Sequence, residues 1–151
     1  MSENYILNFS LLSKLSSLVS LDLSETNFED LSPLSSMTNL VHLDITACNI
    51  SDLSPVASLT SLKTIAADET KVSQEDATQF VRNHPDILLI HHVKDLQSWW
   101  ENLSFTWKSA LIKINPELQI GNPKIEILTQ TLNLSELNLD ESGIETLMPL
   151  V

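Results

Sequence analysis

Apolar residues recur along the chain at a fixed spacing. The segment LVSLDLSETNFEDLSPLSSM begins at Leu18, the similar segment LVHLDITACNISDLSPVASL begins 22 residues later at Leu40, and a third copy begins at Leu62. Each copy can be read as L-x-x-L-x-L-x-x-[T/C]-x-apolar, with Ile or Ala in place of some leucines. A further copy stands apart at Leu134. A repeat of this length predicts a solenoid, in which neighbouring copies bury a core that one copy cannot bury alone.

Each copy is expected to contain one short strand and one return segment. In LVSLDL, Leu21 and Leu23 lie on one face of a strand and the polar residues between them lie on the other, because successive side chains alternate. The return segments read LSPL, LSPV and, in the late copy, LMPL. Their prolines (Pro33, Pro55 and Pro149) fix φ and cannot donate a ladder hydrogen bond, so they are expected outside the strands.

Between the early copies and the late one, the apolar period becomes that of helices. The segment VSQEDATQFVRNHPDILLIHH predicts a helix capped by Ser73, with Asp76 at the capping-box position, and an apolar strand after Pro85. Phe80 and Val81 are expected to face inward from this helix. We interpret the segment as a longer, helical repeat that closes the first block.

Two more helices are predicted in the second half of the chain. The segment DLQSWWENLSFTWKSALIKI has apolar residues at helical spacing, which predicts a single helix that contains all three tryptophans and has Asp95 as its N-cap. The segment NPKIEILTQTLN predicts a helix capped by Asn122, with Pro123 at its first position. The buried stripe of that helix is predicted to consist of Ile125, Leu128 and Leu132.

The repeat pattern resembles the leucine-rich-repeat family, in particular the short 22-residue class found in internalin-like proteins. The resemblance covers about residues 4–92 and 118–151. It implies an α/β fold, namely a right-handed solenoid with one short parallel strand per repeat on its concave side, and here with an intervening helical segment. The family usually has a buried Asn at one position of each copy, and the resemblance implies that a different small residue occupies this position here. A small side chain there can bond to the turning backbone, although a thiol does so only weakly. That position is occupied by Thr26, Cys48, Thr70 and Ser142.

These patterns divide the chain into three segments. Residues 1–92 form a leucine-rich-repeat block that ends in a helical terminal repeat, and residues 93–117 form a Trp-rich helix or linker. Residues 118–151 begin a second, incomplete leucine-rich-repeat block. The ends of such blocks expose strand edges over an apolar stack, which predicts self-association through the solenoid ends.

Charge and composition narrow the classes of partner. The 20 acidic and 8 basic residues give a formal net charge of −12, which disfavours nucleic acid and anionic membrane surfaces as partners. No apolar run approaches the roughly 20 residues of a membrane span, so no membrane insertion is expected. The only cysteine, Cys48, cannot form an internal disulfide, and its position in the repeat predicts a buried, inert thiol. If Met1 is the natural start, Glu3 replaces the basic residue of a signal peptide and the protein is expected in the cytoplasm.

The polar strand positions form the candidate binding surface. They are Ser20, Asp22, Ser24, His42, Asp44, Thr46, Thr64, Ala66 and Asp68. Three carboxylates among nine positions favour a partner that carries Lys or Arg. The leading hypothesis is a non-enzymatic protein-protein interaction module, a scaffold that binds its partner on the concave strand face. The alternative is an architectural fragment of a longer repeat protein, in which binding is done elsewhere.

Residues capable of catalysis or metal binding have simpler explanations. Ser20, His42 and the neighbouring aspartates could make a nucleophile and base, but an open, wet strand face offers no oxyanion hole, so we interpret them as a polar binding face. His91 and His92 are adjacent and would point to opposite sides of a strand, so no metal site is expected. With two glycines in the chain, a phosphate cradle and hence a cofactor are not expected. The tryptophans could anchor a partner, but a stripe at helical spacing is more typical of a core, with Trp99 or Trp100 at its edge.

Overall fold

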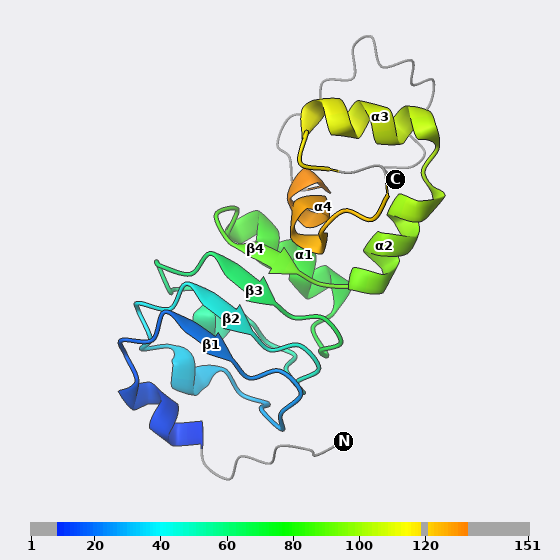
Figure 1. Ribbon diagram of the computed structural model, residues 1–151. Coiled ribbons are helices and arrows are strands. Elements are labelled where there is room, and N and C mark those ends of the chain that lie inside the picture. Colours follow the sequence, from blue (N-terminus) through cyan, green and yellow to red (C-terminus); the bar gives the residue numbers. More distant parts are fainter. Residues whose placement is uncertain (1–8, 119–120, 133–151) are drawn as a thin grey trace. The chain divides into compact units, whose positions relative to one another are not determined.

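The chain forms two compact units that divide between His91 and His92, and each is described by itself. The structure is a computed structural model that describes residues 9–118 and 121–132 (Figure 1). The late repeat copy predicted from Leu134, including Ser142 and Pro149, lies outside the described residues. The three-segment division of the chain stays a prediction.

A parallel sheet runs through the first unit. Its strands β1 (Ser20–Asp22), β2 (His42–Asp44), β3 (Thr64–Ala66) and β4 (Leu88–Ile90) lie side by side in the order of the sequence (Figure 1). The central residues of the strands are in register, so Leu21 pairs with Leu43, Leu43 with Ile65, and Ile65 with Leu89. One strand per repeat, with each repeat paired to the next, is the arrangement that the α/β solenoid prediction requires.

Short 3-10 helices return the chain on the other side of the stack. They are η1 (Phe9–Lys14), η2 (Ser32–Leu34) and η3 (Ser54–Val56). Pro33 and Pro55 lie inside η2 and η3, as predicted for residues that cannot serve in a strand. The backbone N–H groups of Ser32 and Ser54 each donate to the Asp two residues earlier, at 2.8 Å, and so orient the start of each return.

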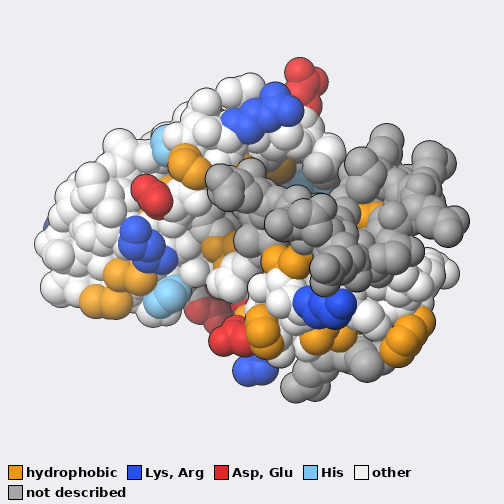
Figure 2. Space-filling view, turned by 90° about the horizontal axis from the view of Figure 1, so that it is seen from above, with side chains coloured by type: hydrophobic (Ala, Val, Ile, Leu, Met, Phe, Trp, Pro, Cys, Tyr) orange, Lys and Arg blue, Asp and Glu red, His pale blue; other side chains and the backbone are white. Residues whose placement is uncertain are grey.

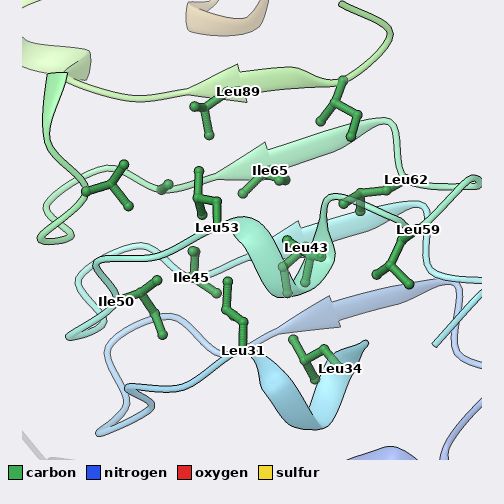
Figure 3. Packing of buried hydrophobic residues seen from close by; sticks show 14 of the residues in the cluster. Leu31, Leu34, Leu43, Ile45, Ile50, Leu53, Leu59, Leu62, Ile65 and Leu89 are labelled. Atoms are coloured by element: carbon green, nitrogen blue, oxygen red, sulfur yellow. The ribbon is translucent and has the colours of Figure 1, made fainter. Parts of the chain in front are cut away.

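The core of the first unit lies between the strands and the returns. Leucines and isoleucines from both sides point toward one another in successive layers (Figure 3). Leu43 and Ile65 are 2% and 0% exposed, and Leu34 and Val56 of the returns are equally buried. The predicted alternation of buried apolar and outward polar positions is therefore confirmed in these repeats.

A column of small polar side chains, partly or fully buried, lies in the turns that follow the strands. The Thr26 hydroxyl donates to the carbonyl of Leu23 at 2.7 Å, and the Thr70 hydroxyl donates to that of Ala67 at 2.8 Å. The buried thiol of Cys48 donates to the same Leu23 carbonyl at 2.9 Å, which links two neighbouring repeats. Small side chains at this position thus bond to the turning backbone, as expected from the resemblance.

The residue before each member of this column has a left-handed backbone. Glu25, Ala47 and Glu69 have φ values of 55°, 57° and 55°. A left-handed conformation is strained for residues with a Cβ, yet it recurs at the same position of three repeats. The N–H groups of Glu25 and Ala47 extend the strand ladder, because they donate to Thr46 and Asp68 of the next repeat at 2.9 Å.

The helical repeat at the end of the first unit also follows the prediction. Helix α1 (Gln74–Asn83) is capped by Ser73, whose hydroxyl accepts the N–H of Asp76 at 3.1 Å. Phe80 is buried, and Val81 packs partly against the same core. The helix ends before Pro85, and β4 follows.

The second unit contains two tryptophan-bearing helices, so the prediction of a single helix is wrong. Helix α2 (Val93–Asn102) holds Trp99 and Trp100, and α3 (Phe105–Ile114) holds Trp107. Ser104 separates them, because its hydroxyl accepts the N–H of Trp107 at 3.3 Å and caps α3. The apolar spacing continues across the break because both helices bury their residues in one cluster.

The predicted starts of these helices also need correction. Asp95 is not the N-cap of α2, since the helix begins at Val93 and Asp95 lies in its first turn, with Oδ2 3.6 Å from Nδ1 of His92. Helix α4 (Ile125–Leu132) begins two residues after Pro123, so neither Asn122 nor Pro123 has the predicted position. The N–H of Leu128 bonds to the carbonyl of Lys124, which places the helix start after these residues.

The core of the second unit is built around tryptophan. Trp100 and Trp107 are buried, and the indole N–H of Trp100 donates to the carbonyl of Gly121 at 3.1 Å. Trp99 is half-buried at the edge of the cluster, as predicted for one of the adjacent pair. Leu128 of α4 joins this core, but Leu132 is exposed and does not extend the predicted stripe. None of the described helices combines the length and the apolar character needed to cross a membrane.

Candidate binding surface

The outward side chains of the sheet form two rows that cross the strands. Register pairs the first residues of the strands as one row and the last residues as the other. The first row is Ser20, His42, Thr64 and Leu88, and the second row is Asp22, Asp44, Ala66 and Ile90. Ser24, Thr46 and Asp68 follow two residues after the second row in their repeats. The structure thus brings all nine predicted residues to the same side of the stack.

Burial separates this face from the core. Ser20, Asp22 and His42 are exposed, and Ser24, Asp44, Thr46, Thr64, Ala66 and Asp68 are half-buried. The central residues Leu43 and Ile65 of β2 and β3 are buried, whereas Leu21 of β1 is half-buried. Side chains of the two rows can therefore change with less effect on the core than the leucines that alternate with them.

The two aspartates of the second row are held by their own turns. Oδ1 of Asp22 accepts the Ser24 backbone N–H at 2.9 Å and the Ser24 hydroxyl at 2.7 Å. Oδ1 of Asp44 accepts the Thr46 N–H at 2.9 Å. Within the described residues, Oδ2 of both carboxylates takes part in no hydrogen bond or ion pair. In each aspartate, Oδ1 therefore stabilises the local turn, and Oδ2 is available to a partner.

These bonds also favour the charged form of Asp22. The Ser24 hydroxyl, followed by the Ser24 backbone N–H, lowers the pKa of Asp22 below its ordinary value of 3.8. Asp22 and Asp44 lie on neighbouring strands in register, and parallel strands are about 4.8 Å apart. Negative charges on neighbouring strands repel each other and attract a cation placed between them.

The acidic character of the chain does not form one continuous area on the face seen in Figure 2. Acidic side chains appear there as separate groups among polar and hydrophobic surface.

No catalytic arrangement is assembled around His42. Within the part of the chain that the structure describes, the imidazole makes no hydrogen bond to Ser20, Asp22 or Asp44. A nucleophile and its base need such a bond, and the base needs a third group that orients it. The geometry favours the interpretation of these residues as part of an open polar face.

Histidines elsewhere have local partners. Nε2 of His91 lies 3.0 Å from the carbonyl of Val72, and His92 is paired with Asp95. Among the described residues, no three His, Cys, Asp or Glu side chains come together in a way that could hold a metal ion.

Two residues of this face were missed by the sequence analysis. Leu88 and Ile90 continue the two rows on β4, although β4 follows β3 by 24 residues instead of 22. The α1 helix adds the extra length, so the fixed repeat frame points to the wrong residues there. The apolar run ILLI after Pro85 did predict this strand, but its outward residues were not assigned to the face.

A second missed signal is the tripeptide D-[L/I]-[S/T]. It occurs at Asp22, Asp30, Asp44 and Asp52, and in each case the Asp side chain accepts the N–H two residues later. This is the pattern of an Asx turn, which can be recognised in a sequence. It would have indicated that Asp22 and Asp44 shape the backbone as well as the surface.

The repeat pattern is also found by comparison with protein families. A family model described as leucine-rich repeats (2 copies) matches residues 16–63. A search of curated proteins finds no match. An internalin (inlF) from Listeria monocytogenes is 29% identical, over 54% of this chain and 24% of its own, with a TM-score of 0.46. An internalin C2 (inlC2) from the same organism is 26% identical, over 56% of this chain and 46% of its own, with a TM-score of 0.44.

The matched region therefore spans less than half of the length of either internalin. Stacked repeats of this kind present an extended concave surface, and protein interaction is the general role of such modules. Residues 16–63, with their paired strands, buried leucines and 3-10 returns, match the leucine-rich-repeat family model and form leucine-rich repeats.

Proposed function

We propose that the first unit is a non-enzymatic module that binds a protein partner across the outward face of β1–β4. The observation that carries this proposal is the pair of in-register rows, in which exposed and half-buried polar side chains continue over neighbouring repeats. These side chains are not part of the hydrophobic core, and β1, β2 and β3 present them in register on neighbouring strands.

The charge of this face supports a basic partner. Asp22, Asp44 and Asp68 contribute three carboxylates to the nine positions, which include neither Lys nor Arg. Complementary charge accelerates association and selects among partners more than it raises affinity. Binding is therefore expected to weaken as salt concentration rises, because exposed charges are screened over about 8 Å at physiological ionic strength.

A peptide library displayed on phage and selected on the intact chain tests the location of the surface. Thr64 lies at the centre of the first row, so Thr64→Arg should weaken the selected peptides at least about tenfold. Ser58→Arg adds the same charge and side chain at an exposed position after η3, and it should leave binding unchanged. Peptides that bind the Thr64→Arg protein as well as the parent protein would place the binding surface elsewhere.

A second candidate function is that of an architectural unit within a longer repeat array. The specific observation is the exposed apolar surface of η1 and the residues that follow it. Leu15 is 46% exposed, whereas Met37 and Leu59 occupy the equivalent position in the next two repeats and are 0% and 2% exposed. A further leucine-rich repeat, or the end of another copy, would cover this apolar surface.

Light scattering over a dilution series tests the second candidate. Association through this apolar surface should give an average mass above that of a monomer at high concentration, and Leu15→Ser should lower it. A strictly monomeric mass at all concentrations would argue against self-association.

A further inference from the structure

The two rows of the strand face change in character from one side of the sheet to the other. On β1 and β2 they consist of Ser20 and Asp22, and of His42 and Asp44. On β3 and β4 they change to Thr64 and Ala66, and then to Leu88 and Ile90. Both rows therefore run from polar or acidic residues to aliphatic ones in the same direction. The face has two chemically different halves.

The geometry of the acidic half suits the binding of a partner's basic side chain. Asp22 and Asp44 are neighbours in register, and Oδ1 of each is already fixed by a backbone N–H. Fixed carboxylates lose little freedom when a partner binds, so more of the interaction is retained as affinity. Their Oδ2 atoms remain available on a face whose two rows include no Lys or Arg.

The aliphatic half presents apolar atoms that water still reaches. Ala66 and Leu88 are half-buried, whereas Ile90 is buried. Covering the exposed parts of Ala66 and Leu88 with an aliphatic side chain would remove apolar area from water, which favours binding. A charged side chain of the ligand placed over Ala66 and Leu88 would lose hydration without gaining an interaction of opposite charge.

We propose that this face binds an extended peptide segment that has a Lys or Arg over Asp22 and Asp44 and an aliphatic side chain over Ala66 and Leu88. This inference rests on the proposed function of the face and specifies its partner. The two contacts are about two strand spacings apart, or roughly 10 Å, when strands lie about 4.8 Å from each other. An extended chain advances about 3.3 Å per residue, so the basic and the aliphatic residue are separated by about three or four positions.

Selection of the same phage library on the parent protein and on three variants tests the inference. Peptides selected on the parent should combine Lys or Arg with Leu, Ile, Val or Met at that separation. The double variant Asp22→Asn, Asp44→Asn keeps the oxygen that accepts each turn N–H, and it should weaken these peptides about tenfold. The double variant Asp30→Asn, Asp52→Asn changes the same charge in the same type of turn on the return side, and it should leave their binding unchanged.

Ala66→Asp supplies a test that adds a contact. The equivalent positions of β1 and β2 already carry Asp, so the repeat accommodates this residue. Peptides selected on this variant should contain an additional basic residue and lose their preference for the aliphatic one. Circular dichroism of each variant checks that the sheet is retained.

The outcomes separate this inference from the proposed function. Peptides that are displaced by Thr64→Arg but lack the basic and aliphatic pair, or that bind equally to the Asp22→Asn, Asp44→Asn protein, would overturn the inference and leave the binding face in place. Peptides that are insensitive to Thr64→Arg, or a selection without enrichment, would count against both.

Discussion

Leu43→Ala is the substitution that most directly tests the repeat core. Leu43 is 2% exposed and lies in register between Leu21 and Ile65, so truncation leaves a cavity that is walled by two neighbouring repeats. Buried Leu→Ala substitutions cost about 2–5 kcal/mol. Because Leu43 has a strand on both sides and little room to collapse, we expect about 3 kcal/mol or more. Leu21→Ala is the matched control, since Leu21 has the same place in β1 but is only half-buried, and it should cost about half as much.

Two optical signals distinguish the first unit from the second in this experiment. Urea unfolding followed by circular dichroism reports on both units, whereas tryptophan fluorescence reports on the second, because Trp99, Trp100 and Trp107 all lie there. Leu43→Ala should lower the stability of the sheet measured by circular dichroism and by amide exchange of β2. A loss within about 0.5 kcal/mol, which is typical of surface sites, would refute the assigned repeat frame. A greater loss for Leu21→Ala than for Leu43→Ala would refute the order of burial.

Three further predictions concern the turns and caps. Ala47→Gly should stabilise the first unit by up to about 1 kcal/mol, because glycine relieves the left-handed strain at φ 57° but loses more freedom on folding; a shift of the urea midpoint to lower concentration would contradict this. Ser104→Ala should cost about 1 kcal/mol in urea unfolding followed by tryptophan fluorescence, and Ser104→Asp should restore most of it, since Asp also caps helices. Asp22 has a lowered pKa, so the stability that its ionised form provides is present above pH 3.8 and is lost as the pH falls through the folded-state pKa. The difference in unfolding free energy between the parent and Asp22→Asn should therefore shrink on acidification. A difference that grew in acid would show that the pKa of Asp22 is raised on folding instead of lowered.

The sequence predicted the repeat block well because many positions repeat the same requirement. Leu21, Leu43 and Ile65 follow one frame, and a shift by one residue would move every one of them to the outward face. The capped helix α1 was also predicted, since Ser73 and Pro85 are strong local signals for its start and end. In these segments local preference and packing point to the same structure.

Elsewhere, local signals competed and the sequence alone did not decide between them. The apolar spacing of residues 96–114 fits one helix, but Ser104 caps a new helix through its bond to the Trp107 N–H. The sequence did not reveal this break, because a serine in such a segment is equally compatible with an exposed helical position. Leu132 has the right spacing for the core of α4 but is exposed. For the candidate surface, the strand alternation identified the nine residues, whereas the length added by α1 concealed Leu88 and Ile90.

Helix α1 has a geometric consequence for the strand face. It takes the place between β3 and β4 that the narrow 3-10 turns η2 and η3 take between the earlier strands. An α-helix with its side chains is about 10–12 Å wide, whereas the strands remain at their normal spacing of about 4.8 Å. Because α1 is wider than the distance between the strands, it separates the last two repeats more on the return side than on the strand side. We therefore expect the repeat that contains β4 to be tilted toward the strand face relative to the repeat that contains β3. A ligand that crosses the sheet from β1 to β4 would then meet a flatter surface at its acidic end and a more enclosing one at its aliphatic end.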